Sequence, residues 1–514
     1  MTTDRVRVFP GTYRDSLLLL SATRAMRDGS GVGFATAAMA SPATLAELTG
    51  KGFAAAELAG ADANALVLAV SADDGQAAAE ALDRGWAVLF AAREAGAGQG
   101  QPGRPAPRTI AAAADRLPEA NVAVVSVPGP YAAMAAHSAL SAGLHVLLFS
   151  DNVSLAEEAG LKQRASKLGR LVMGPGAGTS VLGGTGLGFA NAVRSGPVGV
   201  VAAAGTGAQE AMTLLDRWDI GVSQVIGVGG RDLSAGIGGQ MARDAVRALD
   251  SDPATSVILL VSKPPDPAAA RAVIGASEST PVVAACLGMS APDGALASVP
   301  LASTLEEGAV LVARVLGRPV PDLLAGLPAA TGAAARIADG RTAVRGFYTG
   351  GTLCYEAQVV LGRLLGPVRS NIPLRPELGL PAPPGAHICL DLGEEEYTRG
   401  RPHPMIDPAA RREVIQAEAF GPDVAVVLLD VVLGYGSHPD PAGEIAETCA
   451  DLVAGGAAVV AYVLGTRADP QGFDAQRRTL TGAGAIVTET AAQAARVAAA
   501  IAAREPGLAA VMPR

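Results

Sequence analysis

The chain has 514 residues, of which 49% are hydrophobic and 4% aromatic, and its formal net charge at pH 7 is −9. This length predicts several domains with large buried cores, and the acidic balance without a basic stripe excludes nucleic acids and anionic membranes as expected partners. The scattered cysteines Cys286, Cys354, Cys389 and Cys449 favour buried thiols over a metal site. The N-terminal MTTDRVRVF lacks a signal-peptide core and no 18-residue apolar span occurs, so we expect a cytoplasmic protein.

The first 93 residues predict a small α/β unit, for which a ferredoxin-like fold is one candidate. Apolar runs at residues 6–9, 67–70 and 87–90 are typical of short strands, and helical stretches separate them. Residues 94–108 are rich in glycine, proline and glutamine. This composition predicts a linker or a long exposed loop.

Strand and helix patterns alternate through residues 109–190. Apolar runs at 123–127 and 145–149 predict two strands, each followed by a helix, and a glycine-rich segment lies at 174–179. This alternation is typical of a parallel, doubly wound sheet of the Rossmann type.

A second parallel domain is expected over residues 195–330, and its first element carries a candidate anion site. The apolar run 198–201 enters the turn Gly205-Thr206-Gly207, after which the pattern becomes helical. Such a turn leaves backbone N–H groups at the helix start, where the helix dipole also favours an anion. An ordinary strand-to-helix turn has the same pattern, so this alternative stays open.

Two further strands of this domain are followed by charged residues. Arg231 and Asp232 follow the run at 224–228, and Lys263 follows the run at 257–261. Ligands of open α/β sheets bind at the carboxyl ends of strands. Because lysine and arginine suit phosphate, we expect these residues to lie beside the glycine turn.

A third doubly wound domain is expected over residues 343–512, and it repeats the strand–glycine turn–helix pattern. The repeat places Gly350, Gly351 and Thr352 at a second helix start. A dianionic phosphate needs donors from several directions, so we expect both helix starts to meet in one cleft. The pairing could form within one chain or between two chains of a dimer.

Two polar loops follow strands of the third domain. Arg399, Arg401 and His403 lie in the first loop, where the arginines could hold a substrate or pair with the glutamates at 394–396 as a structural cluster. The second loop holds His438 beside Gly434 and Gly436. Histidines in such loops are candidates for acid–base chemistry.

Other polar residues have simpler interpretations. His145 and His387 lie within strand patterns and are expected to be structural, and Asp391 and Asp430 end strands and are interpreted as caps. Cys354 begins a helix, where a thiolate would be favoured, but a buried small residue explains it as well.

The order of these elements resembles the succinyl-CoA synthetase superfamily, or NDP-forming acyl-CoA synthetases, and more closely its FdrA branch. The resemblance runs from about residue 120 to the end, and GGRDLS, VSKPP, YTGGTLCYEA, YTRGRPHPMIDP and LLDVVLGYG carry it. It implies a CoA-binding-like domain at 109–190, a ligase alpha-like flavodoxin-type domain at 195–330 and a ligase beta C-terminal-like domain at 343–512. The first 93 residues resemble FdrA proteins alone.

The chain departs from the ligase pattern at the positions that carry phosphoryl transfer. The segment at 285–298, which is similar to the loop of the ligase phosphohistidine, contains no histidine, and Lys263 stands where the ligases place a glutamate. The phosphate loop of the beta-like domain reads Gly393-Glu394-Glu395-Glu396, and a nucleotide-grasp domain is absent. A phosphohistidine relay from ATP is therefore not expected.

The FdrA resemblance implies a subunit of a carbamoyl- or acyl-transferring enzyme, similar to oxamate carbamoyltransferase of allantoin catabolism, which requires further subunits. Carbamoyl phosphate or phosphate is the expected ligand, CoA is a weaker candidate, and a homodimer is an additional option. An NDP-forming acyl-CoA synthetase and a non-catalytic scaffold with the ligase fold are the alternatives. The residues assigned to catalysis are Lys263, Arg401, His403 and His438, and those assigned to phosphate or substrate are Gly205, Thr206, Gly207, Arg231, Asp232, Gly350, Gly351, Thr352, Arg399, Gly434 and Gly436.

Overall fold

The structure is a computed structural model that describes residues 2–14, 16–62, 65–95, 107–289, 299–324, 327–398 and 402–511. The chain divides into two compact units. The first unit is Met1–Ala112 with Thr398–Pro402, and the second is Ala113–Tyr397 with His403–Arg514. Among the described residues, no helix combines the length and apolar character that a bilayer span requires.

The first unit is an antiparallel three-stranded sheet in the order β1-β3-β2, covered by helices on both faces. On β3, Leu66, Leu68 and Val70 pack under α1 and α3, while the alternate residues Val67 and Ala69 pack with α2. The elements are β1 (Thr3–Phe9), α1 (Ser16–Arg27), β2 (Val32–Met39), α2 (Pro42–Gly50), β3 (Leu66–Ala72) and α3 (Gly75–Ala95).

The strand expected at 87–90 is wrong, because these residues lie inside α3. Ala78, Ala81, Leu82 and Leu89 of this helix are buried, and their spacing follows one face of an α-helix. The second strand is instead β2, whose sequence VGFATAAM is rich in glycine and alanine and has a weak strand pattern.

The second unit begins with a parallel three-stranded sheet in the order β4-β5-β6. Its strands alternate with helices, as the sequence predicts. The elements of this region are α4 (Ile110–Ala114), β4 (Val122–Val125), α5 (Gly129–Ser141), β5 (His145–Leu148), α6 (Leu155–Lys167) and β6 (Val172–Met173).

A seven-stranded sheet follows, in the order β13-β12-β11-β9-β10-β7-β8. Its first five strands are parallel, and the hairpin β7–β8 adds antiparallel strands beside β10. Its elements are β7 (Thr179–Leu182), β8 (Thr185–Gly188), β9 (Ser195–Ala202), α7 (Gly205–Arg217), β10 (Val222–Gly227), α8 (Gln240–Asp250), β11 (Val257–Ser262), α9 (Pro267–Ile274), β12 (Val282–Cys286), β13 (Leu301–Ala302), α10 (Leu305–Val315) and α11 (Leu327–Ala334).

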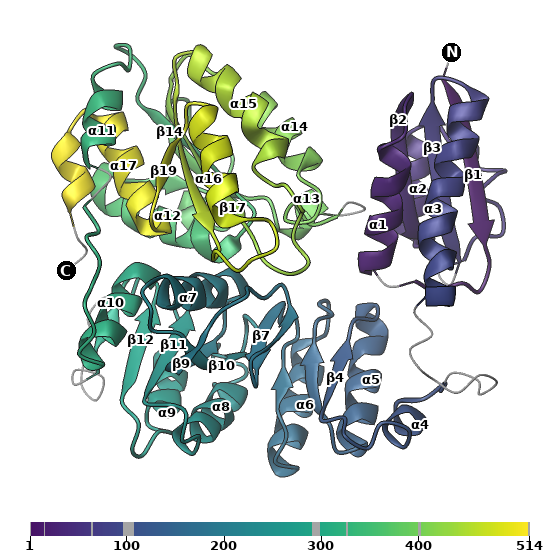
Figure 1. The fold of residues 1–514 in the computed structure, drawn as a ribbon, viewed down its shortest axis with the longest axis horizontal. Helices are drawn as coiled ribbons and strands as arrows, with labels where there is room; N and C mark the ends of the chain where they lie inside the picture. Colours follow the sequence, from purple (N-terminus) through teal and green to yellow (C-terminus); the bar gives the residue numbers. More distant parts are fainter. Residues whose placement is uncertain are drawn as a thin grey trace. The chain divides into compact units, whose positions relative to one another are not determined.

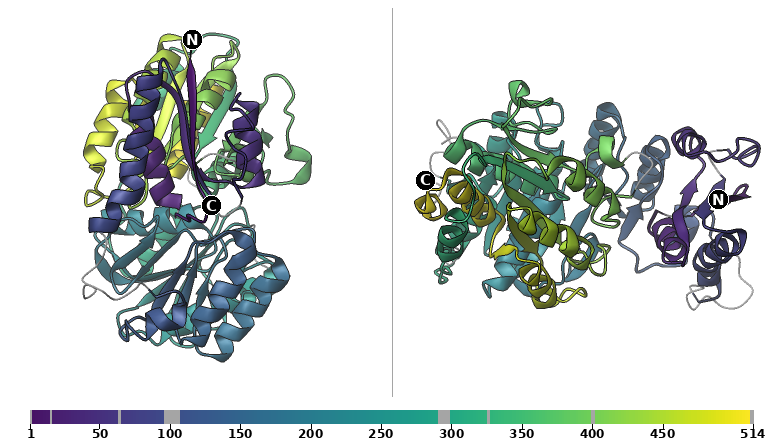
Figure 2. Two further views of the ribbon diagram at one scale, coloured as in Figure 1. Left: turned by 90° about the vertical axis from the view of Figure 1, so that its right-hand side faces the viewer. Right: turned by 90° about the horizontal axis from the view of Figure 1, so that it is seen from above.

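A six-stranded parallel sheet in the order β15-β16-β14-β17-β18-β19 completes the second unit. Its elements are β14 (Ala343–Tyr348), α12 (Gly351–Leu365), β15 (Val368–Arg369), β16 (His387–Asp391), α13 (Glu395–Thr398), α14 (Ala409–Glu418), β17 (Val424–Val432), α15 (Gly443–Ala454), β18 (Ala458–Leu464), α16 (Phe473–Gly482), β19 (Ile486–Thr488) and α17 (Ala491–Ala503), with short 3₁₀ turns at Pro376–Leu378 and Pro506–Ala510. Helices cover both faces of the sheet (Figures 1 and 2), so the predicted doubly wound α/β class is confirmed.

The six- and seven-stranded sheets share one hydrophobic core. Buried side chains of α7, α12 and α17, such as Met212, Leu361 and Val497, belong to the same cluster as Val200 of β9 and Leu428 of β17. These helices lie between the two sheets, as Figure 1 shows for α7 and α12. The shared core therefore holds the starts of α7 and α12 at fixed positions.

Candidate functional site

The starts of α7 and α12 are in direct contact. The backbone N–H of Thr352 donates to Thr206 Oγ1 over 3.2 Å. A Cβ placed on Gly350 would lie 2.8 Å from Thr206 Cγ2, and one placed on Gly207 would lie 2.9 Å from Thr352 Cγ2. Only glycine permits so close an approach at these two positions. The two helix starts therefore meet, as expected, and of the two pairings that the sequence left open the structure shows the one within a single chain.

The two helix starts differ in how their N–H groups are used. Just before α12, Thr349 N and Gly350 N donate to the Asp430 carboxylate over 2.9 and 2.8 Å, and within the first turn of α12 Thr352 N donates to Thr206. At α7, the capping residue is Ala204, so no side chain accepts from the first turn. Gly205 is exposed there. An anion would therefore find its donors at α7, whereas protein oxygens already use donors at α12.

Lys263 supplies a cation beside the start of α7. Val261, two residues earlier on β11, accepts a hydrogen bond from Ala203 N over 2.9 Å. This bond places the end of β11 next to the turn that begins α7. The half-buried Lys263 places its Nζ 5.8 Å from the centre of the Tyr355 ring on α12.

Asp391, at the end of β16, caps the loop that follows, as the sequence interpretation expected, and it also lies against the start of α12. A Cβ on Gly351 would lie only 2.2 Å from Asp391 Oδ2, and Oδ1 accepts a hydrogen bond from Gly393 N over 2.9 Å. Burial is the main cause that raises the pKa of this carboxyl to about 7, and Gly393 and Lys263 oppose the rise. The only sequence signal was its position at a strand end.

His403 lies on the other side of Gly393. A Cβ on Gly393 would lie 2.6 Å from His403 Nε2 and 3.1 Å from Asp391 Oδ1, so both side chains face the same glycine. His403 Nδ1 accepts from Met405 N over 3.2 Å. Burial lowers the pKa of His403 to about 4, so the imidazole is neutral at pH 7.

Gly434, Gly436 and His438 join loops of the second unit to one another. A Cβ on Gly434 would lie 2.6 Å from the Ala190 carbonyl oxygen, and one on Gly436 would lie 3.1 Å from the Phe189 ring. His438 is buried, and its N–H donates to the Met405 carbonyl over 2.8 Å. The three residues therefore pack these loops against one another.

The side chains of Arg231 and Asp232 belong to an ion-pair network at α6. The buried Asp232 carboxylate accepts from Lys162 Nζ over 2.7 Å and from the first N–H groups of α8. Arg231 pairs with Glu158 over 2.8 Å and donates to the Val153 carbonyl. Buried charges require such partners, so this network accounts for both residues.

The remaining sequence candidates that the structure describes have structural surroundings. Arg399 and Arg401 lie outside the described residues. His145 and His387 each accept a backbone hydrogen bond, from Leu171 and Val344, as expected of structural histidines. Cys354 is fully buried, and burial raises its thiol pKa well above the ordinary value, so the thiolate interpretation is wrong.

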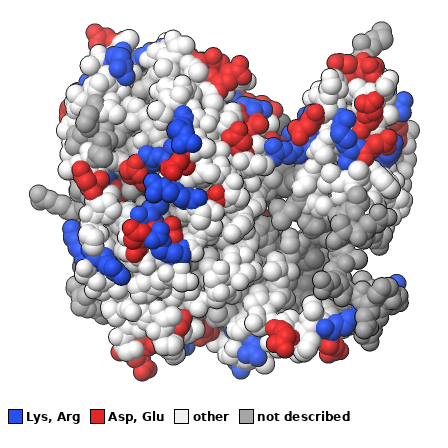
Figure 3. Space-filling view, viewed as in Figure 1, with Lys and Arg blue, Asp and Glu red and all other residues white. Residues whose placement is uncertain are grey.

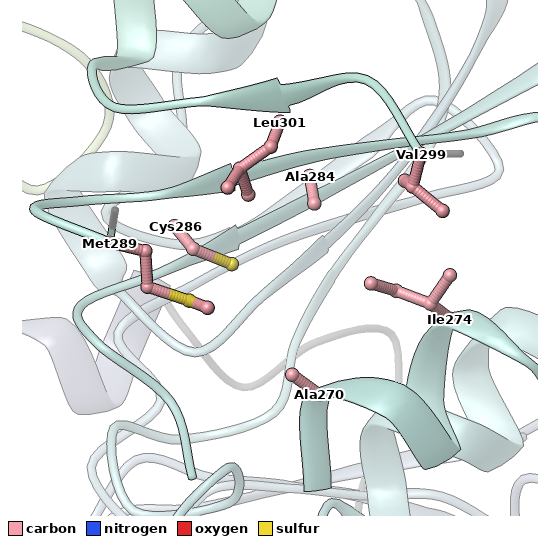
Figure 4. Close-up of a pocket in the computed structure, with 7 residues that line it drawn as sticks. All are labelled: Ala270, Ile274, Ala284, Cys286, Met289, Val299 and Leu301. Carbon is pink, nitrogen blue, oxygen red and sulfur yellow. The ribbon is translucent and has the colours of Figure 1, made fainter. Parts of the chain in front are cut away.

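A small apolar pocket lies at the edge of the seven-stranded sheet. In Figure 4, side chains from α9 face those of β12 and β13 across it. The lining residues are Ala270, Ile274, Ala284, Cys286, Met289, Val299 and Leu301. Among the described residues that line the pocket, the thiol of Cys286 is the one polar side-chain group, and burial raises its pKa to about 12.

Comparison with known proteins identifies the family. Residues 347–501 match the CoA-ligase family, and residues 1–105 match the family described as AllF, heavy metal-associated domain. The protein YahF of Escherichia coli (strain K12) is 37% identical over 499 residues, covering 95% of this chain and 96% of its own. The chain belongs to the FdrA-type family of the succinyl-CoA synthetase superfamily.

Ligase subunits share a shorter part of this FdrA-type chain. The mitochondrial alpha-2 subunit of succinate–CoA ligase [ADP-forming] from Trichomonas vaginalis is 28% identical over 186 residues, which are 34% of this chain and 59% of that subunit. A solved ATP citrate lyase from Methanothrix soehngenii is 22% identical, with a TM-score of 0.31 and coverage of 42% of this chain and 38% of its own. Both relatives exceed the matched region in length.

The heavy-metal description of the N-terminal family does not fit the residues of this FdrA-type chain. Residues 1–105 contain no cysteine and no histidine, the ligands that soft metals prefer. Within the described residues, no group of three or more His, Cys, Asp or Glu side chains could hold a metal ion. On the face in Figure 3, basic and acidic side chains are interspersed.

Proposed function

We propose that this chain is a subunit of an acyl-transferring enzyme and binds the phosphate of an acyl phosphate at the start of α7. The observation that supports this most strongly is the first turn of α7, whose N–H groups have no capping side chain and lie beside Lys263. Backbone donors and a helix dipole at one point attract a phosphate, and the lysine adds a point charge.

Two acceptors for the acyl group are supported by different observations. The ligase matches favour CoA as the acceptor, as in an NDP-forming acyl-CoA synthetase, and the family comparisons support this function more strongly. The AllF match and the absence of histidine from residues 285–298 favour a transferase for carbamoyl phosphate instead. In both cases the nucleophile attacks the carbonyl carbon, the C–O bond to phosphate breaks, and Lys263 with α7 stabilises the departing phosphate.

The chain is expected to act together with other subunits, because its ligase relatives are named as subunits. The complex that co-purifies with the full chain should therefore be assayed. Consumption of carbamoyl phosphate without nucleotide supports the transferase, and formation of succinyl-CoA from succinate, CoA and ATP supports the synthetase. A complex that is inactive in both assays and does not bind phosphate would support the non-catalytic scaffold.

Phosphate binding can be measured on the full chain alone by titration calorimetry with inorganic phosphate. We expect Lys263→Ala to weaken binding about ten- to a hundredfold, because one charge-assisted hydrogen bond is lost. Lys167→Ala on α6 is the matched control and should leave binding unchanged. Gly205→Val should also weaken binding, since a Cβ at Gly205 meets nothing within 4 Å and would cover the N–H groups without disturbing α12. Equal affinities of the Lys263→Ala variant and the wild type would contradict the proposal.

A further inference from the structure

We propose that Asp391 is the proton acceptor for the nucleophile that attacks the acyl phosphate. This inference rests on the proposed function and adds a residue that neither the sequence interpretation nor the family assigns. Three features carry it: the fixed position of the carboxyl group, its closeness to both Lys263 and the start of α12, and the engagement of the other acidic side chain there.

The backbone of Asp391 is fixed from both sides by one side chain. Asn371 Oδ1 accepts from Asp391 N over 2.9 Å, and Asn371 Nδ2 donates to the Asp391 carbonyl over 2.8 Å. The carboxyl group lies against Gly351, the first residue of α12, where a side chain would overlap Oδ2. Glycine at 351 therefore leaves room for this carboxyl group.

Charged and titratable groups surround Asp391 on every packed element. Lys263, which follows β11, favours the carboxylate, whereas Glu394 and Asp430 disfavour it. Cys354 of α12 is a buried neutral thiol, and the imidazole of His403 is neutral at pH 7. The pKa of Asp391 is about 7, which suits a group that accepts and returns a proton at neutral pH.

Asp430 is engaged through both of its carboxylate oxygens, whereas the hydrogen bond from Gly393 N engages Oδ1 of Asp391. Asp430 accepts from Thr349 N, Thr349 Oγ1 and Gly350 N, and it pairs with Arg411 over 3.1 Å. His403 has a pKa of about 4 and is a weaker base than Asp391. A carboxylate at 391 is therefore the stronger base beside Lys263.

The step balances without a further reactant. The nucleophile, an N–H or S–H group, forms a bond to the carbonyl carbon as its proton moves to an Asp391 carboxylate oxygen. The bond between the carbonyl carbon and the phosphate oxygen breaks, and its electron pair leaves with the phosphate, which Lys263 and the α7 donors stabilise. In the reverse direction the Asp391 carboxylic acid protonates the leaving nitrogen or sulfur.

The test compares Asp391→Asn with wild type in the complex of the full chain, using carbamoyl phosphate and acyl phosphates as donors. The amide oxygen can still accept from Gly393 N, so the fold is retained. We expect the rate to fall at least about a hundredfold, while calorimetric binding of inorganic phosphate is retained. In wild type, kcat/KM should rise with pH through about 7, and the variant should lose this dependence.

A second variant and a matched control separate a chemical role from a structural one. Asp391→Ala should regain activity with added formate, which supplies a carboxylate, and a purely structural role would show no rescue. Asp266→Asn, at the N-terminal cap of α9, is the control and should behave as wild type because asparagine also caps helices. An active Asp391→Asn variant with an unchanged pH profile would overturn the inference. If calorimetry detects no binding of inorganic phosphate to the wild type, that result would instead overturn the proposed function.

Discussion

At the scale of single residues, two buried carboxyl groups of the second unit, Glu210 and Glu306, differ in their partners. Glu210 of α7 lies fully buried, accepts from the Tyr462 hydroxyl and faces Glu306 and Arg217. Burial is the main cause that raises the pKa of Glu210 from 4.5 to about 7. By contrast, Glu306 is held by both terminal nitrogens of the buried Arg496. Arg496 therefore stabilises the charge of Glu306 directly, whereas the described contacts of Glu210 include no such ion pair.

The raised pKa of Glu210 predicts a pH-dependent stability. Between about pH 4.5 and 7 the unfolded chain releases this proton while the folded chain keeps it, so the free energy of unfolding falls as pH rises. Glu210→Gln keeps an acceptor for Tyr462 and removes the titration. At pH 8 the variant should be more stable than wild type by about 3 kcal/mol, and near pH 4.5 the two should agree. Urea unfolding at both pH values measures this difference. A wild type that is at least as stable as the Glu210→Gln variant at pH 8 would contradict the prediction.

At the scale of elements, the sequence predicts the parallel strands and the two helix starts well, because apolar runs and glycine turns are local signals. It fails where the signal is not local. The run at 87–90 has strand-like composition but lies in α3, where helical contacts with α1 bury one face. Asp391 is an isolated aspartate, and only the packing of β16 against α12 places it at Gly351. Arg231 is correctly placed after β10, but its side chain turns to Glu158 on another helix.

The contact between α7 and α12 predicts a specific cost for removing one hydroxyl group. Thr206→Val keeps the shape of the side chain but leaves the buried Thr352 N–H without its acceptor. We expect the free energy of unfolding to fall by about 1–3 kcal/mol, while Thr206→Ser, which retains the hydroxyl, loses less. Urea denaturation of the two variants tests this. Equal stability of the valine variant and wild type would show that the hydroxyl contributes nothing to the contact.

At the scale of the whole molecule, the chain divides into two units with separate hydrophobic cores. The first unit buries Leu66, Leu68 and Val70 within its own helices. The polar groups proposed for phosphate and proton transfer belong to the second unit. The two units can therefore be tested separately.

The composition of the first unit predicts its response to metals. Because residues 1–105 contain neither cysteine nor histidine, Zn²⁺ or Cu⁺ should leave the Tm of a fragment of residues 1–95 unchanged, whereas a ligand that binds the folded state raises it. The fragment should unfold cooperatively by calorimetry, and the remainder of the chain should bind phosphate as tightly as the full protein. A metal-induced rise in Tm would contradict this expectation.

The hydrophobic core shared by the six- and seven-stranded sheets has a consequence for dilute solution. In a two-chain arrangement, helix starts from different subunits separate as protein concentration falls below their dissociation constant. Here α7 and α12 are parts of one polypeptide, so their encounter is intramolecular and has an effective concentration that dilution does not change. The paired helix starts should persist at any expression level, and only the recruitment of other subunits should follow mass action.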